Sequence, residues 1–358
     1  MNRIERLKAR LKAEKLEGVL LLNDSNIRYM SGFTGSDSYV LISDDVNAFI
    51  TDSRYTEQAE SECKGFEVIR WGKPLLGLNE TIKELCTKYG MTKIAFGKEH
   101  VTYGIYEKLI KELPAVEWIP TSELVEQLRS IKDEEEIECI REAAQIADQA
   151  FAEILKYIRP GVTEKDIERE LQYLIKKQGA DDIGFSSIVA SGKRSSLPHA
   201  IPSDKKIEKG DFVTLDFGAT YRGYRSDMTR TVIVGEADDK QREIYGIVKA
   251  AQAAASDFIK AGVSCKAVDD SAREYISNAG YKECFGHGLG HGLGLDIHEE
   301  PYLSPSSEKV LDFGNVVTVE PGIYLPNWGG VRIEDTVVVG ENGIEVLTKS
   351  TKELIIIG

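Results

Sequence analysis

The segment GHGLGHGLGLDIHEEP, residues 286–301, holds three of the five histidines in this chain. Four acidic residues stand in strand-like motifs on either side of it: Asp216 in TLDFGA, Asp227 in YRSDMT, Glu320 in TVEPGIY and Glu334 in GGVRIEDT. Carboxylates and imidazoles are ligands of divalent metal ions in proteins. We therefore interpret these four carboxylates, with one imidazole, as a two-metal hydrolytic centre.

Length and composition are those of an ordinary globular protein. A chain of 358 residues is long enough for two domains, each with its own core. Its hydrophobic fraction of 42% and charged fraction of 29% indicate neither disorder nor a membrane protein. The net charge of −14 argues against non-specific binding to nucleic acid, which depends on a positive field.

The cysteines and the N-terminus indicate a cytoplasmic protein. Five cysteines, an odd number, are scattered without a CxxC spacing, so neither a disulfide framework nor a zinc knuckle is expected. The first residues, MNRIERLKARLKAEK, are charged throughout and lack the apolar stretch of a secretory signal. Apolar runs are too short for a membrane helix, which needs about 18 residues.

Residues 1–122 are predicted to form an α/β domain. The spacing of Ile4, Leu7 and Leu11 predicts an amphipathic helix over residues 2–16. The polar segment Asn23–Tyr39 lacks periodicity, and we expect a surface connection there. The remaining pattern predicts strands at 19–22, 39–42, 46–51, 66–70 and 93–96, and helices near 54–62, 78–89 and 102–112.

A second domain is predicted over residues 133–358, after a linker at 123–132. Its start is marked by SIKDEEE, a capping sequence followed by an acidic first turn. The helix that follows carries an apolar stripe made of Ile137, Ile140, Ala144, Ala147, Phe151, Ile154 and Ile158.

This second domain contains an internal duplication. Residues 159–179 match residues 260–280 at a constant offset of 101, which aligns Gly161 with Gly262. Further on, DFVTLDFG matches NVVTVEPG at an offset of 104, which aligns Asp216 with Glu320. Chance similarity between two helix–strand segments does not readily align four acids in order. We expect two α/β halves related by a pseudo-two-fold axis, with the acids at their junction.

Two hairpins bring the acids together in this prediction. Pairing Asp216 with Asp227 centres the first hairpin on the Tyr-Arg-Gly-Tyr turn, and pairing Glu320 with Glu334 centres the second on a Pro-Asn-Trp-Gly-Gly turn. Each pair would then face across its ladder, with Cβ atoms about 5 Å apart. The alternative is that these acids lie on solvated strand faces, but the strands are otherwise apolar and β-branched, which is typical of buried strands.

Carboxylates this close need a cation. At 4 Å and an effective dielectric constant of about 20, each pair costs roughly 4 kcal/mol. Two divalent ions would balance four carboxylates, and an oxygen-rich site favours Mn²⁺, with Co²⁺ or Zn²⁺ as alternatives. Two ions about 3.5–4 Å apart can hold a bridging water and lower its pKa.

The glycine-rich segment fits neither of two familiar motifs. It is not HExxH, because Gly288, Leu289 and Gly290 separate its first two histidines. It is not a phosphate-binding loop, because no Gly-Lys-Ser/Thr follows. We expect the glycines to let the backbone pass close to metals and substrate. His199, in RSSLPHAIP, is by itself as consistent with a structural role as with a functional one.

At these motifs the chain resembles a known family. The series LDFGA, RSDMTRT, HGLGHGLGLDIHE, TVEPGIY and GVRIEDT is similar to the Xaa-Pro peptidase branch of the pita-bread metallopeptidases, which comprises prolidase and aminopeptidase P. The first 122 residues, with SNIRYMSGF, resemble the creatinase-type N-terminal domain. The resemblance implies a mixed α/β fold with a duplicated catalytic domain, and every metal-ligand position of the active pattern is filled.

The resemblance also implies roles for the acids and one histidine. Asp216 would chelate one metal ion, and Asp227 and Glu334 would bridge both. His291 and Glu320 would bind the second ion, and Glu320 would also take a proton from the bridging water.

Further residues would border the substrate by the same resemblance. His199 and His298 match histidines beside the scissile bond and are therefore catalytic candidates. His287 would line the pocket, Arg332 would contact substrate, and Tyr324 would lie near the metals.

The implied activity is hydrolysis of Xaa-Pro peptide bonds through a metal-bridging hydroxide, with an Xaa-Pro dipeptidase favoured. Aminopeptidase P, which acts on longer peptides, is the alternative, and a non-catalytic binding protein on the same fold is a remote one. Methionine aminopeptidase is disfavoured because it usually lacks the N-terminal domain, and creatinase because its metal ligands are replaced. The family also implies a homodimer in which the N-terminal domain of one subunit lies near the active site of the other. Our hypothesis is that the Asn23–Tyr39 segment makes that contact.

Overall fold

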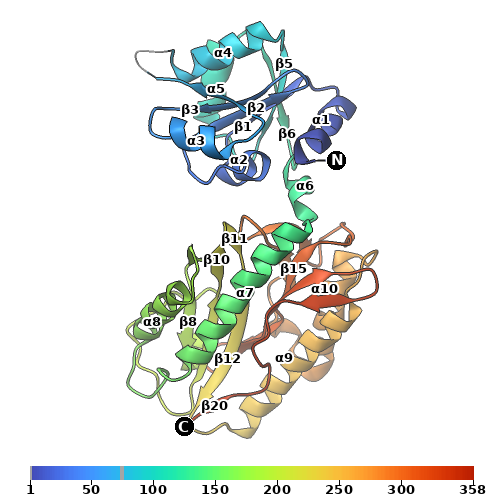
Figure 1. Cartoon of the computed structure of the whole chain (residues 1–358). Helices are drawn as coiled ribbons and strands as arrows, with labels where there is room; N and C mark the ends of the chain where they lie inside the picture. Colours follow the sequence, from blue (N-terminus) through green and yellow to red (C-terminus); the bar gives the residue numbers. More distant parts are fainter. Residues whose placement is uncertain (1, 73–75) are drawn as a thin grey trace. The chain divides into compact units, whose positions relative to one another are not determined.

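The protein divides into two compact units, Met1–Arg129 and Ser130–Gly358. The structure, a computed structural model, describes residues 2–72 and 76–358 (Figure 1). The first unit is built on a six-stranded sheet in the order β4-β3-β2-β1-β5-β6, in which β1 pairs antiparallel with β2 and parallel with β5. Its elements are α1 (Arg3–Ala13), β1 (Gly18–Leu21), α2 (Asp24–Ser31), β2 (Tyr39–Ser43), β3 (Asn47–Thr51), α3 (Thr56–Glu62), β4 (Glu67–Arg70), α4 (Leu78–Lys88), β5 (Lys93–Gly97), α5 (Tyr103–Glu112), β6 (Glu117–Thr121) and α6 (Glu126–Ser130).

The prediction of a surface connection over Asn23–Tyr39 is wrong for its first half, which forms α2. Asn23 caps this helix by accepting a hydrogen bond from the backbone of Asn26, and Gly32 ends it in the left-handed conformation. The buried amide of Asn26 donates to Glu126 and accepts from Arg129. A helix that buries a polar residue against partners a hundred positions away leaves no apolar periodicity in the sequence.

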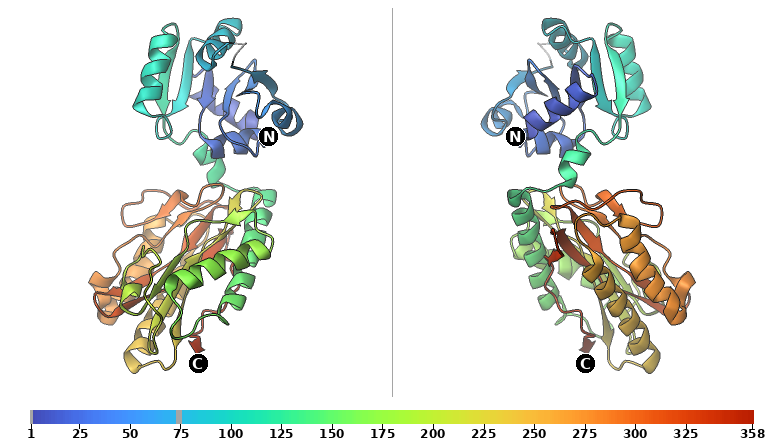
Figure 2. Two further views of the ribbon diagram at one scale, coloured as in Figure 1. Left: turned by 90° about the vertical axis from the view of Figure 1, so that its left-hand side faces the viewer. Right: turned by 90° about the vertical axis from the view of Figure 1, so that its right-hand side faces the viewer.

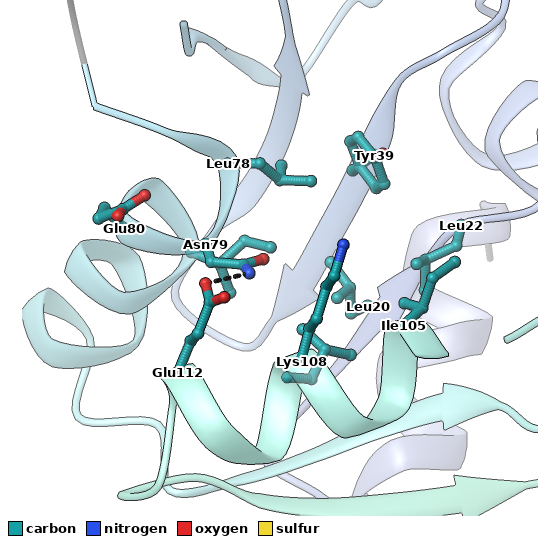
Figure 3. Close-up of a pocket in the computed structure, with 11 residues that line it drawn as sticks. Leu20, Leu22, Tyr39, Leu78, Asn79, Glu80, Ile105, Lys108 and Glu112 are labelled. Atoms are coloured by element: carbon teal, nitrogen blue, oxygen red, sulfur yellow. Dashed lines mark hydrogen bonds between the residues drawn. The ribbon is translucent and has the colours of Figure 1, made fainter. Parts of the chain in front are cut away.

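A cavity of about 290 Å³ lies in this unit, lined by β1, β2 and the helices α4 and α5 (Figure 3). Leucine, isoleucine and tyrosine side chains form most of its wall. At its edge Asn79 donates a hydrogen bond to Glu112, and Lys108 extends beside it. Its described lining residues include no histidine and no buried acid, so the chemistry predicted from the sequence belongs to the second unit.

The second unit contains two larger sheets, in the orders β20-β12-β9-β8 and β14-β13-β15-β18-β19. Its helices are α7 (Glu134–Ile154), α8 (Glu164–Lys177), α9 (Asp239–Phe258) and α10 (Cys265–Ile276), with a 3₁₀ turn η1 at Gly192–Ser196. Its strands are β7 (Asp182–Ile183), β8 (Ile188–Ser191), β9 (Phe212–Phe217), β10 (Ala219–Tyr221), β11 (Tyr224–Arg225), β12 (Met228–Val234), β13 (Gly290–Gly292), β14 (Glu299–Leu303), β15 (Val316–Val319), β16 (Gly322–Leu325), β17 (Gly329–Arg332), β18 (Asp335–Val339), β19 (Ile344–Val346) and β20 (Ile356–Ile357).

Each half of this unit has its own hydrophobic core, covered by its own pair of helices. In the first half α7 and α8 pack together against β8, β9 and β12, and in the second α9 and α10 pack against β14, β15 and β18 (Figures 1 and 2). The whole predicted apolar stripe is buried, and its second half, Ala147, Phe151, Ile154 and Ile158, belongs to the first core. The strand orders β8-β9-β12 and β13-β15-β18 correspond, so the predicted duplicated α/β fold is confirmed.

The duplicated helices begin in the same way. Thr163 and Ser264 accept hydrogen bonds that cap α8 and α10. Two residues earlier, Gly161 and Gly262 have φ values of +90° and +87°, which glycine adopts without strain.

Among the described residues, no helix combines the length and the apolar character that crossing a bilayer requires.

The two hairpins differ in how well their register was predicted. The second has the predicted register along its whole length, because Val319 pairs with Asp335 and Leu325 with Gly329. The first does not, because Asp216 pairs with Thr229 rather than with Asp227.

The turn explains the shift in the first hairpin. Tyr221 pairs with Tyr224, which leaves Arg222 and Gly223 as a two-residue turn with φ values of +48° and +81°. Positive φ at both central residues is the requirement of a type I′ turn, which suits the twist of a hairpin. Asp216 and Asp227 are therefore diagonal neighbours across the ladder.

Because Gly161 and Gly262 have open space beside them, substitution by alanine tests the backbone alone. We expect Gly161→Ala and Gly262→Ala each to destabilise the chain by about 1–2 kcal/mol, because an L-residue is strained at positive φ. The measurement is urea denaturation followed by circular dichroism.

Gly246→Ala is the control for this pair of substitutions. Gly246 lies inside α9 with open space around it, so alanine there should stabilise the chain by up to about 1 kcal/mol. A clearly unequal loss at Gly161 and Gly262 would contradict the equivalence of the two halves.

Candidate metal centre

The four acids predicted from the sequence lie at strand ends in the second unit. Asp216 is the penultimate residue of β9, and Asp227 directly precedes β12. Glu320 directly follows β15, and Glu334 directly precedes β18. The positions are equivalent in the two halves, so the duplication brings two acids from each hairpin to one place.

The imidazole in this cluster is His291, on β13. Its Nε2 atom lies 3.4 Å from Oε1 of Glu320 and 3.7 Å from Oδ2 of Asp227. Ligand atoms of Asp227, His291 and Glu334 all lie within 4.8 Å of one another, which is close enough to share one ion. Asp216 is held instead by Arg332, whose Nη2 donates to its Oδ2 at 2.6 Å.

The glycines beside His291 serve the neighbouring strands. A Cβ atom on Gly290 would lie 2.0 Å from the carbonyl oxygen of Thr318, and one on Gly292 would lie 2.3 Å from that of Glu300. Side chains are therefore excluded at both positions. At these two positions the missing side chain makes room for adjacent backbone. The expectation that the glycines also let the backbone pass close to metals and substrate stays a prediction.

Burial makes the charges of this cluster costly. Burial, and then the charges of Glu334 and Asp216, raise the pKa of Asp227 well above its usual range. Burial, followed by the charges of Glu320 and Asp216, does the same to the pKa of Glu334. Burial also raises the pKa of Glu320 to about 8.

Two oxygen atoms in the cluster are buried without a hydrogen-bond donor. They are Oδ1 of Asp227 and Oε1 of Glu334. Burial lowers the pKa of His291 to about 4, which keeps the imidazole neutral and able to bind a metal ion. Acceptors without donors, raised carboxyl pKa values and a neutral imidazole together fit a divalent cation.

Arg332 connects the cluster to its surroundings. This buried guanidinium donates to Asp216, to the hydroxyl of Tyr324 at 2.9 Å and to the hydroxyl of Thr229 at 3.0 Å. Although burial opposes the charged form, the charges of Tyr324, Asp216 and the nearby glutamates raise the pKa of Arg332 above its usual value. Thr229 in turn donates to Oε2 of Glu334 at 2.6 Å.

Threonines are the residues that sequence reasoning missed. Thr318 donates to Glu320 and accepts from the backbone of His291. Thr229, which pairs with Asp216 across the first hairpin, links Glu334 to Arg332. Their position within two residues of a predicted ligand was the available clue, because a buried carboxylate needs donors.

A cavity of about 290 Å³ opens beside the cluster. Three loops contribute histidines to its wall, and Asp216, Glu320 and Arg332 also border it. The histidines are His199, His287, His291 and His298, so all of the predicted site histidines meet here.

The histidines differ in their surroundings. His287 pairs with the hydroxyl of Tyr324 at 2.9 Å, and burial lowers its pKa to about 4. The ring of His298 lies 4.4 Å from that of His291, and burial lowers the pKa of His298 also. His199 is exposed on a turn after η1. The cavity thus presents imidazoles to a small ligand at the edge of the acid cluster.

Comparison with known proteins identifies the family of this chain. The model of metallopeptidase family M24 matches residues 138–341, and that of the creatinase/prolidase N-terminal domain matches residues 3–131. The chain therefore belongs to metallopeptidase family M24, and it is a metallopeptidase with a creatinase-type N-terminal domain. The resemblance predicted from its motifs is confirmed.

Individual relatives match along almost the whole chain. A solved structure of an Xaa-Pro dipeptidase from Bacillus anthracis is 49% identical, covers 99% of both chains and has a TM-score of 0.96. A protein of Pyrococcus furiosus named Xaa-Pro dipeptidase is 39% identical over 99% of both chains. A solved X-Pro aminopeptidase from Thermotoga maritima is 42% identical, with a TM-score of 0.91, and covers 99% of this chain and 100% of that one.

The acid cluster predicts how stability depends on pH without metal. Glu320 retains a proton in the folded chain that the unfolded chain releases, so its contribution is full below its ordinary pKa of 4.5 and is lost as the pH rises through about 8. Asp227 and Glu334, whose pKa values are also raised in the folded chain, act in the same direction. Burial lowers the pKa values of His287 and His291, so these two residues act in the opposite direction. They reduce the stability of the folded chain as the pH falls below their ordinary pKa of 6.5.

Between pH 6.5 and 8 these histidines are neutral in both the folded and the unfolded chain, so the pH dependence of stability comes from the carboxyl groups. In EDTA we expect the unfolding free energy to fall by about 1.4 kcal/mol per pH unit for each retained proton. Urea denaturation measures this slope, and saturating Mn²⁺ should flatten it. A slope that is flat or rising in EDTA would contradict the prediction.

Removal of single charges tests cation binding directly. We expect Asp227→Asn and Glu334→Gln each to weaken Mn²⁺ binding at least about 100-fold, measured by calorimetry on the metal-free chain. Both variants should unfold at no lower urea concentration than the parent in EDTA, because each relieves repulsion. Glu341→Gln, at an exposed position beyond β18, is the control. Parent-like affinity in both variants would place the cation elsewhere.

Proposed function

We propose that this chain is an Xaa-Pro dipeptidase that depends on two divalent metal ions. The observation that carries the proposal is the buried acid cluster, with its donor-less oxygens, at the wall of a small cavity lined by histidines. Relatives of 39% and 49% identity bear the name Xaa-Pro dipeptidase. The activity is assigned to residues 133–358.

Five side chains would hold the ions in this proposal: Asp216, Asp227, His291, Glu320 and Glu334. Four carboxylates with one imidazole form an oxygen-rich set, which favours Mn²⁺ over Co²⁺ or Zn²⁺. When bound, divalent ions supply Lewis acidity to the scissile carbonyl and to the attacking water.

The other steps belong to side chains at the cavity. Glu320 would accept a proton from the attacking water, since it lies at the cavity wall. The nitrogen of proline must gain a proton as the bond breaks, and His298 or His199 would donate it. Arg332 and His287, each hydrogen-bonded to Tyr324, would fix the opposite side of the substrate.

An Xaa-Pro bond suits such a site. Its nitrogen is a tertiary amide without an N–H group, so an enzyme cannot hold the bond through that donor. Polarisation of the carbonyl and protonation of the nitrogen do not need it. A cavity of about 290 Å³ is at the lower end of small-molecule sites, which span about 300–1,000 Å³, and this favours a dipeptide.

Aminopeptidase activity on longer Xaa-Pro peptides is the second candidate. It is favoured by the 42% identity to the X-Pro aminopeptidase of Thermotoga maritima. The two activities differ in whether the cavity accepts chain beyond the proline.

One assay separates these functions. The purified chain, loaded with Mn²⁺, Co²⁺ or Zn²⁺, is offered Ala-Pro and Ala-Pro-Ala, and released alanine is measured. We expect rapid cleavage of the dipeptide, fastest with Mn²⁺, and at least about tenfold slower cleavage of the tripeptide, because the small cavity excludes further residues.

Other outcomes of this assay are equally informative. Efficient cleavage of the tripeptide would favour the aminopeptidase. Cleavage of neither peptide with any metal would reject both and favour a binding protein on this fold.

We also propose that the protein is a cytoplasmic homodimer. None of the five cysteines, all of which lie in the described residues, forms a disulfide, which fits a reducing compartment. The segment Asn23–Tyr39, with exposed Thr34 and Asp37 beyond α2, is proposed to approach the partner's active site. Sedimentation equilibrium measures the assembly state, and a monomer at micromolar concentration would reject the dimer.

A further inference from the structure

Three histidines of the cavity lie on loops rather than on strands, and two of them, His199 and His287, are each held by a buried carboxylate. The proposed metal ligands lie on or directly beside the paired strands β9, β12, β13, β15 and β18, whereas a loop has no strand ladder of its own. Buried carboxylates outside the cavity supply several of the polar contacts that hold these two loops.

Glu164, the first residue of α8, holds both ends of the His199 loop. Its carboxylate is fully buried. Oε1 accepts from the backbone and hydroxyl of Ser191 at 2.7 and 2.9 Å. Oε2 accepts from the backbone and hydroxyl of Ser203 at 3.0 and 2.7 Å. One side chain therefore closes the loop that contains His199.

Arg194 extends this clamp to the histidine turn itself. Its Nε donates to Oε2 of Glu164 at 3.0 Å, and its Nη2 donates to the carbonyl of Ile201 at 2.6 Å. Ile201 is two residues beyond His199, so the guanidinium ties the turn to the buried carboxylate. The contacts of Glu164 are all with N–H and O–H donors, which an ionised carboxylate accepts without competition.

Asp269, on α10, holds the His287 loop in the same manner. It is fully buried, and its Oδ1 accepts from the backbone of Leu289 at 2.9 Å. It also pairs with Arg273, whose Nε lies 2.7 Å from its Oδ2. Arg273 then donates to the carbonyls of Phe285 and His287 at 2.8 and 2.7 Å. The backbone of the histidine is thus held directly.

The two clamps come from the duplicated helices but not from equivalent positions. The repeat aligns Glu164 with Cys265, a buried thiol. Asp269 lies one helical turn after Cys265 on the same face of α10. Each half therefore uses a buried helical carboxylate and an arginine to hold a loop with one cavity histidine. The carboxylate does not occupy the same position of the repeat in the two halves.

We propose that Glu164 with Arg194, and Asp269 with Arg273, are positioning residues that hold His199 and His287 against the substrate. The proposal rests on the peptidase function proposed above. Because catalysis is sensitive to misplacement of about 1 Å, loosening either clamp should lower kcat/KM while cation binding on the strands is retained.

The test uses Arg194→Met and Arg273→Met, which keep the aliphatic stem and remove the guanidinium. Arg169→Met is the matched control, since Arg169 is an exposed arginine of α8 paired with Asp166. By hydrogen exchange we expect faster exchange over residues 192–203 in the first variant and over 285–289 in the second. The control should change neither segment, and all three should bind Mn²⁺ within twofold of the parent.

Double variants separate positioning from general damage. Arg194→Met should lower kcat/KM on the dipeptide by about tenfold or more in the parent but less than twofold in a His199→Ala background. Arg273→Met should behave likewise with respect to His287→Ala. Equal losses with and without the histidine would overturn the proposal.

The test still decides if a variant fails to fold or if the parent has no peptidase activity. If Arg194→Met does not fold, Ser203→Ala removes one hydroxyl contact of Glu164 and should give the same pattern with a smaller effect. If the parent cleaves no Xaa-Pro peptide, the proposed function fails, and hydrogen exchange still decides whether the clamps hold the loops. Unchanged exchange in both arginine variants would overturn the clamps independently of activity.

Discussion

Repulsion between buried carboxylates is the constraint on which the catalytic unit depends. Asp227 and Glu334 are almost completely buried, and each has one oxygen without a donor. Water would relieve this repulsion in an exposed loop, but strands of valine, isoleucine and leucine exclude it. Arg332 neutralises part of the charge, and the acid to which it donates a hydrogen bond is Asp216. The arrangement is therefore stable in its charged form only with cations present, which is the behaviour expected of a metallopeptidase.

Strand geometry could be predicted from the sequence where local rules decide it. The second hairpin has the predicted register because both its turn and its acids point to the same pairing. In the first hairpin the acids were assumed to face each other, whereas the positive φ values at Arg222 and Gly223 fix the turn one position further along. Turn chemistry therefore outweighed the preference for direct pairing, and a diagonal arrangement still brings the two acids together.

Contacts between residues far apart in the sequence could not be predicted from the sequence alone. α2 is stabilised by hydrogen bonds of Asn26 with Glu126 and Arg129, and the local sequence does not predict contacts with such distant partners. The site histidines were identifiable from their motif, but their support was not, because Glu164 and Asp269 are ordinary acids within amphipathic helices. A buried charge far from a motif is recognisable only after folding has shown what it contacts.

The same repulsion links folding to function. Repulsion between the crowded acids lowers the stability of the cation-free fold. Cations that bind only the folded state raise its stability again. The hydrophobic cores under the two helix pairs must therefore be large enough to keep the acids together before any cation arrives. A duplicated unit meets this requirement, since each half contributes its own core and only two of the acids. Residues that would be destabilising in either half alone become a binding site when the halves are joined.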